Sequence, residues 1–253
     1  MGGLGSDVAK EAAEIVLLDD NFSTLVTAIR AGRTIFQNLK NVILASITAN
    51  LGELTLVCLG FAGVAVGLQL PITAVQILAV DLIGELLPLM ALTFDPPERA
   101  VMTSPPRKLE DHIVSRNSLP GLFFFGLLMG TAAYISFYMV QRDGGSPGSS
   151  QAAAYVTIIL VQYMNILSRR TTRTIFSIYL FSNRQLWAAL GISSIIVLLL
   201  INVPAAGVWF GFEALRIHDW FWPLIGAAMF LLCFEIKKLL RKTGSSGFSG
   251  ALP

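Results

Sequence analysis

The sequence predicts an all-α membrane protein, a bundle of six transmembrane helices with a short α/β remnant of a cytoplasmic domain at its N-terminus. Of 253 residues, 54% are hydrophobic and only 13% are charged, and the mean hydropathy is +0.68. These values lie far from the average of soluble domains. The hydrophobic residues also gather in stretches of about 20 residues, the length that crosses a hydrocarbon core. An ordinary soluble globule is therefore excluded.

Each hydrophobic stretch is predicted to form one membrane-spanning helix. For any single stretch the alternative is a buried helix of a large soluble core, but six in succession with so little charge argue against it. The fourth is the weakest, because it is short and polar at both ends. The six stretches are residues 40–64, 71–94, 119–141, 151–168, 186–211 and 219–240.

Basic residues predict how the helices are oriented. Short loops rich in Lys and Arg stay on the cytoplasmic side of a membrane. Sixteen of the 18 Lys and Arg residues precede the first stretch, follow the last, or lie in the second and fourth connections, and only Arg142 and Arg216 lie on the other side. Both termini are therefore predicted to be cytoplasmic, in a multi-pass protein of a plasma or inner membrane.

The overall charge and the cysteines narrow the function further. A net charge of +2 gives no basic surface for a polyanion, so no nucleic-acid partner is expected. Cys58 and Cys233 lie far apart inside apolar runs, which supports neither a disulfide framework nor a metal cluster. We interpret both cysteines as packing residues.

Residues 1–37 have the charge and alternation of a soluble protein. We interpret them as the edge of a cytoplasmic domain, with a short helix at Asp7–Glu14 followed by a buried strand at residues 15–18. Ser23 is predicted to cap the next helix, which continues into the membrane. Residues 38–242 would form the transport domain, and the Gly/Ser-rich residues 243–253 a disordered tail.

The helix that enters the membrane has no Pro or Gly between Arg33 and Leu51. A helix that is continuous from a soluble domain into the bilayer can transmit force between them. Mere tethering of the two parts is the alternative interpretation.

Three acidic residues lie well inside the predicted spans, Glu53 in the first and Asp81 and Glu85 in the second. Each costs about 2.5 kcal/mol or more at the centre of a membrane if it is charged and unpartnered. No Lys or Arg lies at a comparable depth, so a bound cation or a proton must compensate them. Permanently protonated carboxyls that hydrogen-bond to neighbouring helices are the alternative.

Spacing brings further oxygen ligands to these acids. Asn50 is three residues before Glu53, and Asp81 is four before Glu85, so each pair shares a helix face. Pro88 cannot donate to the carbonyl of Gly84, which predicts a free backbone oxygen beside the acids. Hard oxygen ligands favour sodium, potassium, calcium or protons over zinc or copper.

Several segments together resemble the P-type cation-transporting ATPases of the calcium and sodium/potassium pump branch. The segment Met1 to Val26 resembles the end of their phosphorylation domain. Thr48-Ala-Asn-Leu-Gly-Glu53 is similar to their fifth transmembrane helix, and the segment from Asp81 to Pro97 to their sixth. Gln162-Tyr-Met-Asn165 with Arg169-Arg170 resembles the eighth, and Glu235-Ile-Lys-Lys238 the end of the tenth.

The resemblance implies a set of cation ligands in the membrane. Asn50, Glu53, Asp81 and Glu85 match ligands of that branch, and Gln162 and Asn165 match a third contributor. Three positions depart from the family. Gly84 stands where relatives usually have a hydroxyl residue, Ala49 where the sodium/potassium branch has Ser or Lys, and Asn165 where sodium pumps have an acid. These departures leave the identity and number of the cations open.

The motifs of the catalytic half are missing from the sequence. We find no Asp-Lys-Thr-Gly-Thr phosphorylation motif, no Thr-Gly-Glu loop and no Gly-Asp-Gly-Xaa-Asn-Asp magnesium motif. The chain is therefore expected to hold no catalytic or cofactor-binding residues and not to hydrolyse ATP alone. In the intact pump the resemblance implies ATP, Mg²⁺, the bilayer, and partner domains for actuation, nucleotide binding and phosphorylation, with transmembrane helices one to four.

The favoured function is thus the ion-binding transmembrane portion of an ATP-driven cation pump, as a fragment of a longer polypeptide, a broken reading frame or a natural truncation. A free-standing cation channel or regulatory subunit built from the same helices, or an inactive fragment, is the alternative. A secondary transporter is disfavoured because no paired internal repeat is evident.

Overall fold

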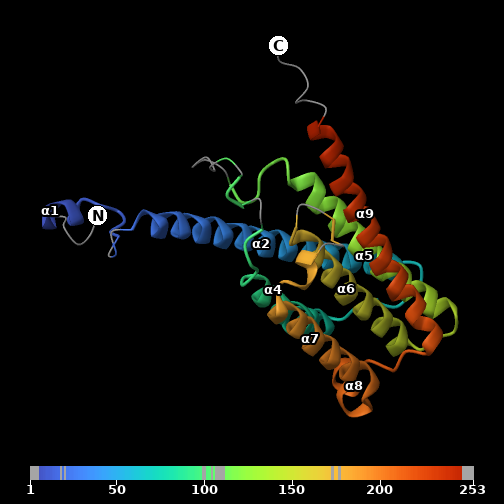
Figure 1. The fold of residues 1–253 in the computed structure, drawn as a ribbon. Helices are drawn as coiled ribbons and strands as arrows, with labels where there is room; N and C mark the ends of the chain where they lie inside the picture. Colours follow the sequence, from blue (N-terminus) through green and yellow to red (C-terminus); the bar gives the residue numbers. More distant parts are fainter. Residues whose placement is uncertain are drawn as a thin grey trace.

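The chain folds into a bundle of helices from which one long helix projects (Figure 1). The structure is a computed structural model that describes residues 6–17, 19, 21–98, 101–103, 105, 112–171, 174, 175 and 178–246. The α-helices are α1 (Asp7–Glu11), α2 (Phe22–Val64), α3 (Ala74–Ala79), α4 (Leu86–Leu92), α5 (Leu119–Arg142), α6 (Pro147–Arg169), α7 (Arg184–Asn202), α8 (Pro204–Phe210) and α9 (Phe221–Ser246). A π-helix, η1 (Val80–Glu85), joins α3 to α4, and two 3-10 turns are η3 (Ile178–Phe181) and η4 (Ile217–Trp220).

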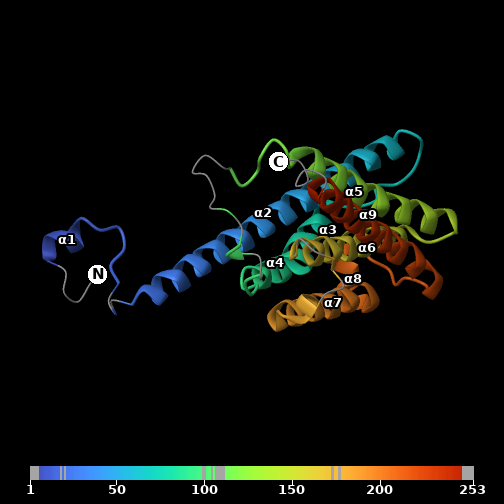
Figure 2. The ribbon, with the colours of Figure 1, turned by 45° about the horizontal axis from the view of Figure 1, so that its top comes forward.

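Helix α2 is continuous over 43 residues, in agreement with the absence of Pro and Gly between Arg33 and Leu51. At 1.5 Å per residue it is ~65 Å long, about twice the thickness of a hydrocarbon core. Its first half projects away from the bundle, with α1 beyond its end (Figures 1 and 2). The prediction that Ser23 caps this helix is wrong. Asn21 is the cap, because its side-chain oxygen accepts a hydrogen bond from the Ser23 backbone N–H at 2.9 Å.

The predicted α/β remnant at the N-terminus is not supported. Helix α1 is present but ends at Glu11, and residues 15–17 of the predicted strand form none, with Ile15 68% exposed. Residue 18 lies outside the described residues. A strand needs a neighbour to pair its backbone groups, and the described part of the chain contains no other strand.

Five helical segments are long and apolar enough to cross a membrane. They are α2, the segment Ala74–Leu92 formed by α3, η1 and α4, and then α5, α6 and α7. The sixth predicted stretch also forms a helix, α9, but Glu235, Lys237 and Lys238 lie in its second half. The predicted count of six spanning helices is therefore not supported by length and composition, which give five among the described residues.

The fifth predicted stretch, residues 186–211, is broken in two. Helix α7 ends at Asn202, Val203 is extended, and Pro204 occupies the first turn of the short helix α8. Proline has no N–H to continue the ladder of α7 but fits the start of a new helix. Gly211 then ends α8 in the left-handed conformation, at φ +72°.

Helix α6 lies at the centre of the bundle, where it contacts α2, α5, α9 and η1. In its most apolar window 83% of the residues are buried, against 33% to 50% in the other four candidate spans. This position explains why the fourth stretch has the weakest sequence signal. A helix that faces other helices rather than lipid can carry polar and small residues.

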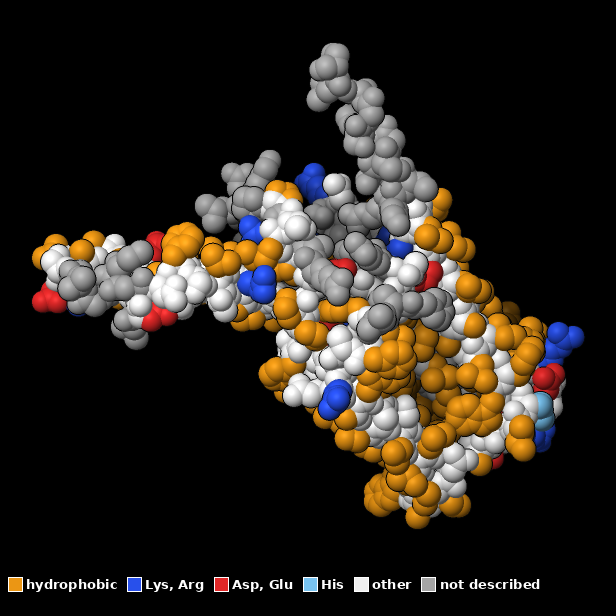
Figure 3. Space-filling model, in the orientation of Figure 1, with side chains coloured by type: hydrophobic (Ala, Val, Ile, Leu, Met, Phe, Trp, Pro, Cys, Tyr) orange, Lys and Arg blue, Asp and Glu red, His pale blue; other side chains and the backbone are white. Residues whose placement is uncertain are grey.

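The outward faces of the surrounding helices are apolar, and hydrophobic side chains cover much of the visible bundle surface (Figure 3). Such a face is compatible with lipid acyl chains. Large exposed hydrophobic residues include Phe123, Phe124 and Leu127 of α5, Ile192, Ile195 and Leu199 of α7, and Leu232 and Ile236 of α9.

Helices α2 and α5 cross in close contact through glycines. A Cβ at Gly130 would lie 2.5 Å from the Thr55 Cβ and 2.9 Å from the Leu56 backbone N, and one at Gly126 would lie 2.5 Å from the Leu51 Cβ. Small residues at such a crossing let two membrane helices approach closely.

We predict that Gly130→Ala destabilises the bundle by about 1–3 kcal/mol, because the new methyl group collides with the α2 backbone. Gly191→Ala on α7 is the matched control, since nothing lies within 4 Å of its Cβ position. There the helical propensity of Ala stabilises by about 0.5–1 kcal/mol. Thermal unfolding in detergent measures both, and equal midpoints for the two variants would contradict the packing described here.

Candidate cation site

Helix α2 turns a polar stripe toward the bundle in its membrane half. Thr48, Gly52 and Glu53 are buried and recur at helical spacing with Ala45, Ala49 and Leu56. Glu53 is only 6% exposed. The stripe follows from the 3.6-residue period of the helix, which directs these positions to the same side. Glu53 is therefore placed inside the bundle and not toward lipid.

The second predicted span carries its acids on a π-helical turn. Thr73 and Gln76 form a capping box at the start of α3. In η1 the backbone hydrogen bonds change to the five-residue spacing of a π-helix, so that the Leu86 N–H bonds to the Asp81 carbonyl. Single π-turns inside α-helices are frequently found at functional sites. Asp81 begins this turn and Glu85 ends it.

The Gly84 carbonyl, which Pro88 cannot donate to, stays predicted to be free, and the neighbouring Ile83 carbonyl is hydrogen-bonded. The Ser193 hydroxyl of α7 donates a 2.8 Å hydrogen bond to the carbonyl of Ile83. Gly84 is buried, and a Cβ there would lie 2.9 Å from the Ile159 side chain of α6. Gly84 therefore lets η1 pack against α6, and its role as a ligand stays a prediction.

The three membrane acids converge. Glu53, Asp81 and Glu85 each offer a carboxylate oxygen, and these three atoms lie within 4.8 Å of one another. Glu53 and Glu85 are buried and Asp81 is partly buried. Within the described part of the chain, Glu53 Oε1 and Glu85 Oε1 are buried without a hydrogen-bond partner. Buried polar atoms normally have partners, so the state of these two oxygens calls for an explanation such as a proton, a water molecule or an ion.

Asn50, predicted as a fourth ligand, is exposed in this chain. Its side-chain amide donates a 3.0 Å hydrogen bond to the carbonyl of Ser46 one turn earlier on α2. The Asn50 amide is therefore engaged by its own helix, and the role of Asn50 as a ligand stays a prediction. None of the chain's described elements covers it.

Gln162 and Asn165 of α6 are almost fully buried, at 1% and 0% exposure, but they are hydrogen-bonded to the protein. The Asn165 amide donates to the carbonyl of Ala45 and to Gln162 Oε1, both at 3.1 Å. Asn165 Oδ1 accepts from Arg169 Nε at 2.8 Å. Both the nitrogen and the oxygen of the Asn165 amide are thus hydrogen-bonded within the protein, and the role of Asn165 as a ligand stays a prediction.

Arg169 is a residue of this region to which the sequence analysis gave no role in the site, although it counted Arg169 among the basic residues of the fourth connection and in the resemblance to the eighth helix. Helix α6 extends to Arg169, so its guanidinium reaches back to Asn165 and also donates to Thr48 Oγ1 of α2 at 2.7 Å. The spacing of four residues between Asn165 and Arg169 is the signal that could have revealed the contact.

A second buried polar group, the Asp95 junction, lies where the chain leaves α4. Asp95 forms an ion pair with Arg170, at 2.9 Å between Oδ1 and Nη2. Arg170 also donates to the Leu180 carbonyl and to Ser182 Oγ. Burial and the Asp95 carboxylate raise the pKa of Tyr179, so its hydroxyl stays protonated and donates to Asp95 Oδ2 at 3.2 Å.

The Asp95 junction also connects two further helices. Asn38 of α2 donates to the backbone carbonyls of Thr93 and Asp95, at 3.1 and 2.8 Å. Asn183, the cap of α7, donates to the carbonyl of Ala91 and to Asp95 Oδ1. The end of the segment that carries Asp81 and Glu85 is therefore tied to α2, α6 and α7 at once.

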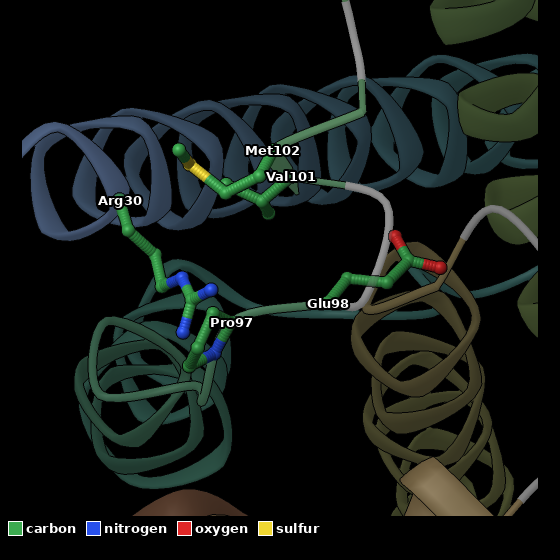
Figure 4. Close-up of a pocket in the computed structure, with 5 residues that line it drawn as sticks. All are labelled: Arg30, Pro97, Glu98, Val101 and Met102. Carbon is green, nitrogen blue, oxygen red and sulfur yellow. The ribbon is translucent and has the colours of Figure 1, made fainter. Parts of the chain in front are cut away.

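A surface hollow of about 270 Å³ lies between α2 and the connection after α4 (Figure 4). Arg30 extends from α2 toward Pro97 on the other side of this hollow. Arg30 precedes Glu53 by 23 residues on the same helix, or ~35 Å. The hollow is therefore distinct from the carboxylate cluster.

Comparison with known proteins establishes the class to which this bundle belongs. Residues 69–240 match the family described as cation transporting ATPase, C-terminus. The chain belongs to this family, and it is a multi-pass membrane protein that corresponds to the C-terminal part of such an ATPase. The resemblance found from the residues is confirmed.

Individual relatives support the same family. The chain is 33% identical to calcium-transporting ATPase 1 of Bacillus cereus over 96% of its own length and 29% of the relative's. It is 34% identical to the calcium-transporting ATPase of Bacillus subtilis over 87% of its own length and 24% of the relative's. It is 31% identical to potassium-transporting ATPase alpha chain 2 of Homo sapiens over 94% of its own length and 26% of the relative's. The chain thus spans between about a quarter and 29% of these relatives.

We predict that Arg170→Met destabilises the fold by about 3–5 kcal/mol, because Asp95 is left buried without its charge partner. The matched control is Arg142→Met, the same exchange at an exposed position. Adding Asp95→Asn to Arg170→Met should recover part of the loss, which a double-mutant cycle of unfolding free energies measures. Additive effects of the two substitutions would contradict the coupling.

Proposed function

We propose that this chain is the ion-binding transmembrane portion of an ATP-driven cation pump of the calcium or sodium/potassium class. The observation that carries the proposal is the convergence of Glu53, Asp81 and Glu85 within 4.8 Å, with two buried oxygens that lack a partner in the described part of the chain. Membership in the cation-transporting ATPase family supports it.

The electrostatics of the cluster require a positive partner. Charged carboxylates inside a bilayer are costly, and three together also repel one another. No Lys or Arg of the described chain forms an ion pair with them. A transported cation or protons would supply the missing charge. Because all the ligands are hard oxygens, calcium, sodium, potassium and protons are the candidates.

The ligand set would be completed by parts of the pump outside this chain. Asn50 lies on an exposed surface of α2, one turn from Glu53. We infer that further transmembrane helices cover this surface and turn Asn50 into a ligand. The remaining partners would be the actuator, nucleotide-binding and phosphorylation domains, which bind ATP and Mg²⁺. Without them this chain would not hydrolyse ATP.

Helix α2 is suited to couple those domains to the site. It continues unbroken from Phe22, outside the bundle, to the helical turn that carries Glu53. Residues 1–37 would belong to the edge of the phosphorylation domain and the stalk, and residues 38–242 to the transport domain. The predicted boundary of a disordered tail at residue 243 is wrong, because α9 extends to Ser246. Movement of the cytoplasmic part could then reach the carboxylates as a tilt of one rigid rod.

We also propose that α9 is a sixth membrane crossing. Its first turns are apolar, and its charges gather at one end, where Lys238 pairs with Glu235 at 2.7 Å. Lysines at a helix end can extend to the membrane interface. Six crossings would place both termini on the cytoplasmic side, in agreement with the distribution of basic residues.

We predict that Glu53→Gln, in the pump that contains this chain, raises the cation concentration for half-maximal ATPase stimulation at least about tenfold, because one charged ligand is lost. The matched control is Glu213→Gln, which changes an exposed glutamate that accepts a hydrogen bond from Ser146. Cation-stimulated ATP hydrolysis measures both. Unchanged stimulation in Glu53→Gln would overturn the proposal. Cation flux through the isolated chain without ATP would instead favour a channel.

The proposed orientation predicts which loops a membrane-impermeant thiol reagent can reach in intact cells. A Cys introduced as Gly144→Cys, in the turn between α5 and α6, should be labelled from outside. Ser182→Cys, in the connection before α7, should be labelled only after permeabilisation. Both substitutions are made together with Cys58→Ala and Cys233→Ala, because these are the native cysteines. Labelling of Ser182→Cys from outside, with Gly144→Cys labelled only after permeabilisation, would contradict the prediction that both termini are cytoplasmic.

A further inference from the structure

The hydroxyl of Ser193 on α7 bonds to the backbone of a different helix. Its side chain is fully buried, and it donates a 2.8 Å hydrogen bond to the carbonyl of Ile83 in η1. Other buried hydroxyls of the bundle, those of Thr48, Ser136 and Thr157, donate to the carbonyl four residues earlier in their own helix. Such back-bonding is the usual alternative to solvent for a hydroxyl inside a helix. The bond from Ser193 to Ile83 therefore needs a cause in η1.

That cause is the combination of the π-turn with Pro88. In η1 the Leu86 backbone N–H bonds to the carbonyl of Asp81, five residues earlier. At this spacing the N–H directed at the Ile83 carbonyl would be that of residue 88, which is a proline and has none. An unpaired backbone carbonyl inside a membrane is costly, because no water is present to bond to it. The Ser193 hydroxyl thus supplies the donor that Pro88 lacks.

The bond lies in the middle of the turn that carries two of the membrane acids. Ile83 is two residues after Asp81 and two before Glu85. Next to it, Gly84 packs against α6, where a Cβ would lie 2.9 Å from the Ile159 side chain. The π-turn is therefore held between α6 and α7. These contacts fix its rotation about its own axis, and with it the direction of both carboxylates.

Helix α7 holds the same segment at a second point. It lies alongside α4 in both ribbon views (Figures 1 and 2). Asn183, ten residues before Ser193 and ~15 Å away along the helix, donates to the carbonyl of Ala91 at 3.0 Å. Two bonds from one helix oppose both rotation and sliding of the acidic segment.

We propose that Ser193 is a positioning residue of the cation site. It replaces the N–H that Pro88 lacks and keeps η1 in the π-register in which its two acids converge with Glu53. Its effect on the cation is indirect and passes through the Ile83 carbonyl. This inference rests on the proposed pump function, since it concerns the geometry of the same membrane site.

Removal of the hydroxyl tests the inference in the pump that contains this chain. Ser193→Ala should raise the cation concentration for half-maximal equilibrium binding about five- to tenfold, because η1 must shift to find another donor for the Ile83 carbonyl. Ser193→Thr keeps the hydroxyl and should stay within about twofold of the unaltered pump. The matched control is Ser136→Ala, which removes a buried hydroxyl that bonds within its own helix. Radioactive Ca²⁺, Na⁺ and Rb⁺, each alone, are the probes.

A second background separates positioning from simple packing. Pro88→Ala restores a backbone N–H to the segment, so the helix itself can supply the missing donor. Adding Ser193→Ala to Pro88→Ala should then change the half-maximal concentration less than about twofold. A serine that only fills space would produce the same factor in both backgrounds.

The outcomes separate this inference from the proposed function. Unchanged binding in Ser193→Ala, or an equal loss in both backgrounds, would overturn the role of Ser193. If Ser193→Ala does not fold, the double variant decides: binding like that of Pro88→Ala supports the inference, and failure to fold refutes it. If Pro88→Ala binds no cation, thermal unfolding midpoints of the same cycle decide, with coupling in support and additivity against. Absence of binding in the unaltered pump would refute the proposed function itself, and the thermal cycle would still test Ser193.

Discussion

The three carboxylates inside an apolar bundle impose the constraint on which the rest of the structure depends. Glu53 and Glu85 are buried, and each has an oxygen without a partner in the described chain. A bilayer offers no water to solvate such groups, so helices must enclose them and bring their partners into the bundle. The close crossing of α2 with α5, the π-turn of η1 and the packing of Gly84 against α6 all hold the two acidic segments in this arrangement.

The polar groups of the bundle are separated into two layers with different tasks. The layer around Glu53, Asp81 and Glu85 lacks compensating charge, whereas the Asp95 junction is fully paired through Arg170, Tyr179 and Asn183. Buried networks of this kind are rigid when all their members are satisfied. Asn38 attaches α2 to the junction, so a movement of the projecting half of α2 would act on a fixed frame near the end of the acidic segment.

Sequence reasoning succeeded where a single helix decides the outcome. The continuity of α2 follows from the absence of Pro and Gly between Arg33 and Leu51, and the meeting of the acids follows from their spacing and the cost of burying them. It failed where the structure depends on a pairing partner or on the exact residue at which a helix begins or ends. Residues 15–17 have the composition of a strand but no strand to pair with, Asn21 competes with Ser23 for the helix cap, and Pro204 divides a stretch that hydropathy treats as uniform.

The sequence by itself determined that this is a helical membrane protein of the cation-transporting ATPase family and that Glu53, Asp81 and Glu85 form its polar centre. Hydropathy and helical period are properties of the chain alone, so they can be evaluated without a fold. Only the tertiary structure decided that α6 is the central helix, that Asn50 is exposed and that Arg169 engages Asn165. These three features depend on how one helix is rotated against another. The ligands predicted from the sequence of one helix do not reveal which side chains are hydrogen-bonded to another helix.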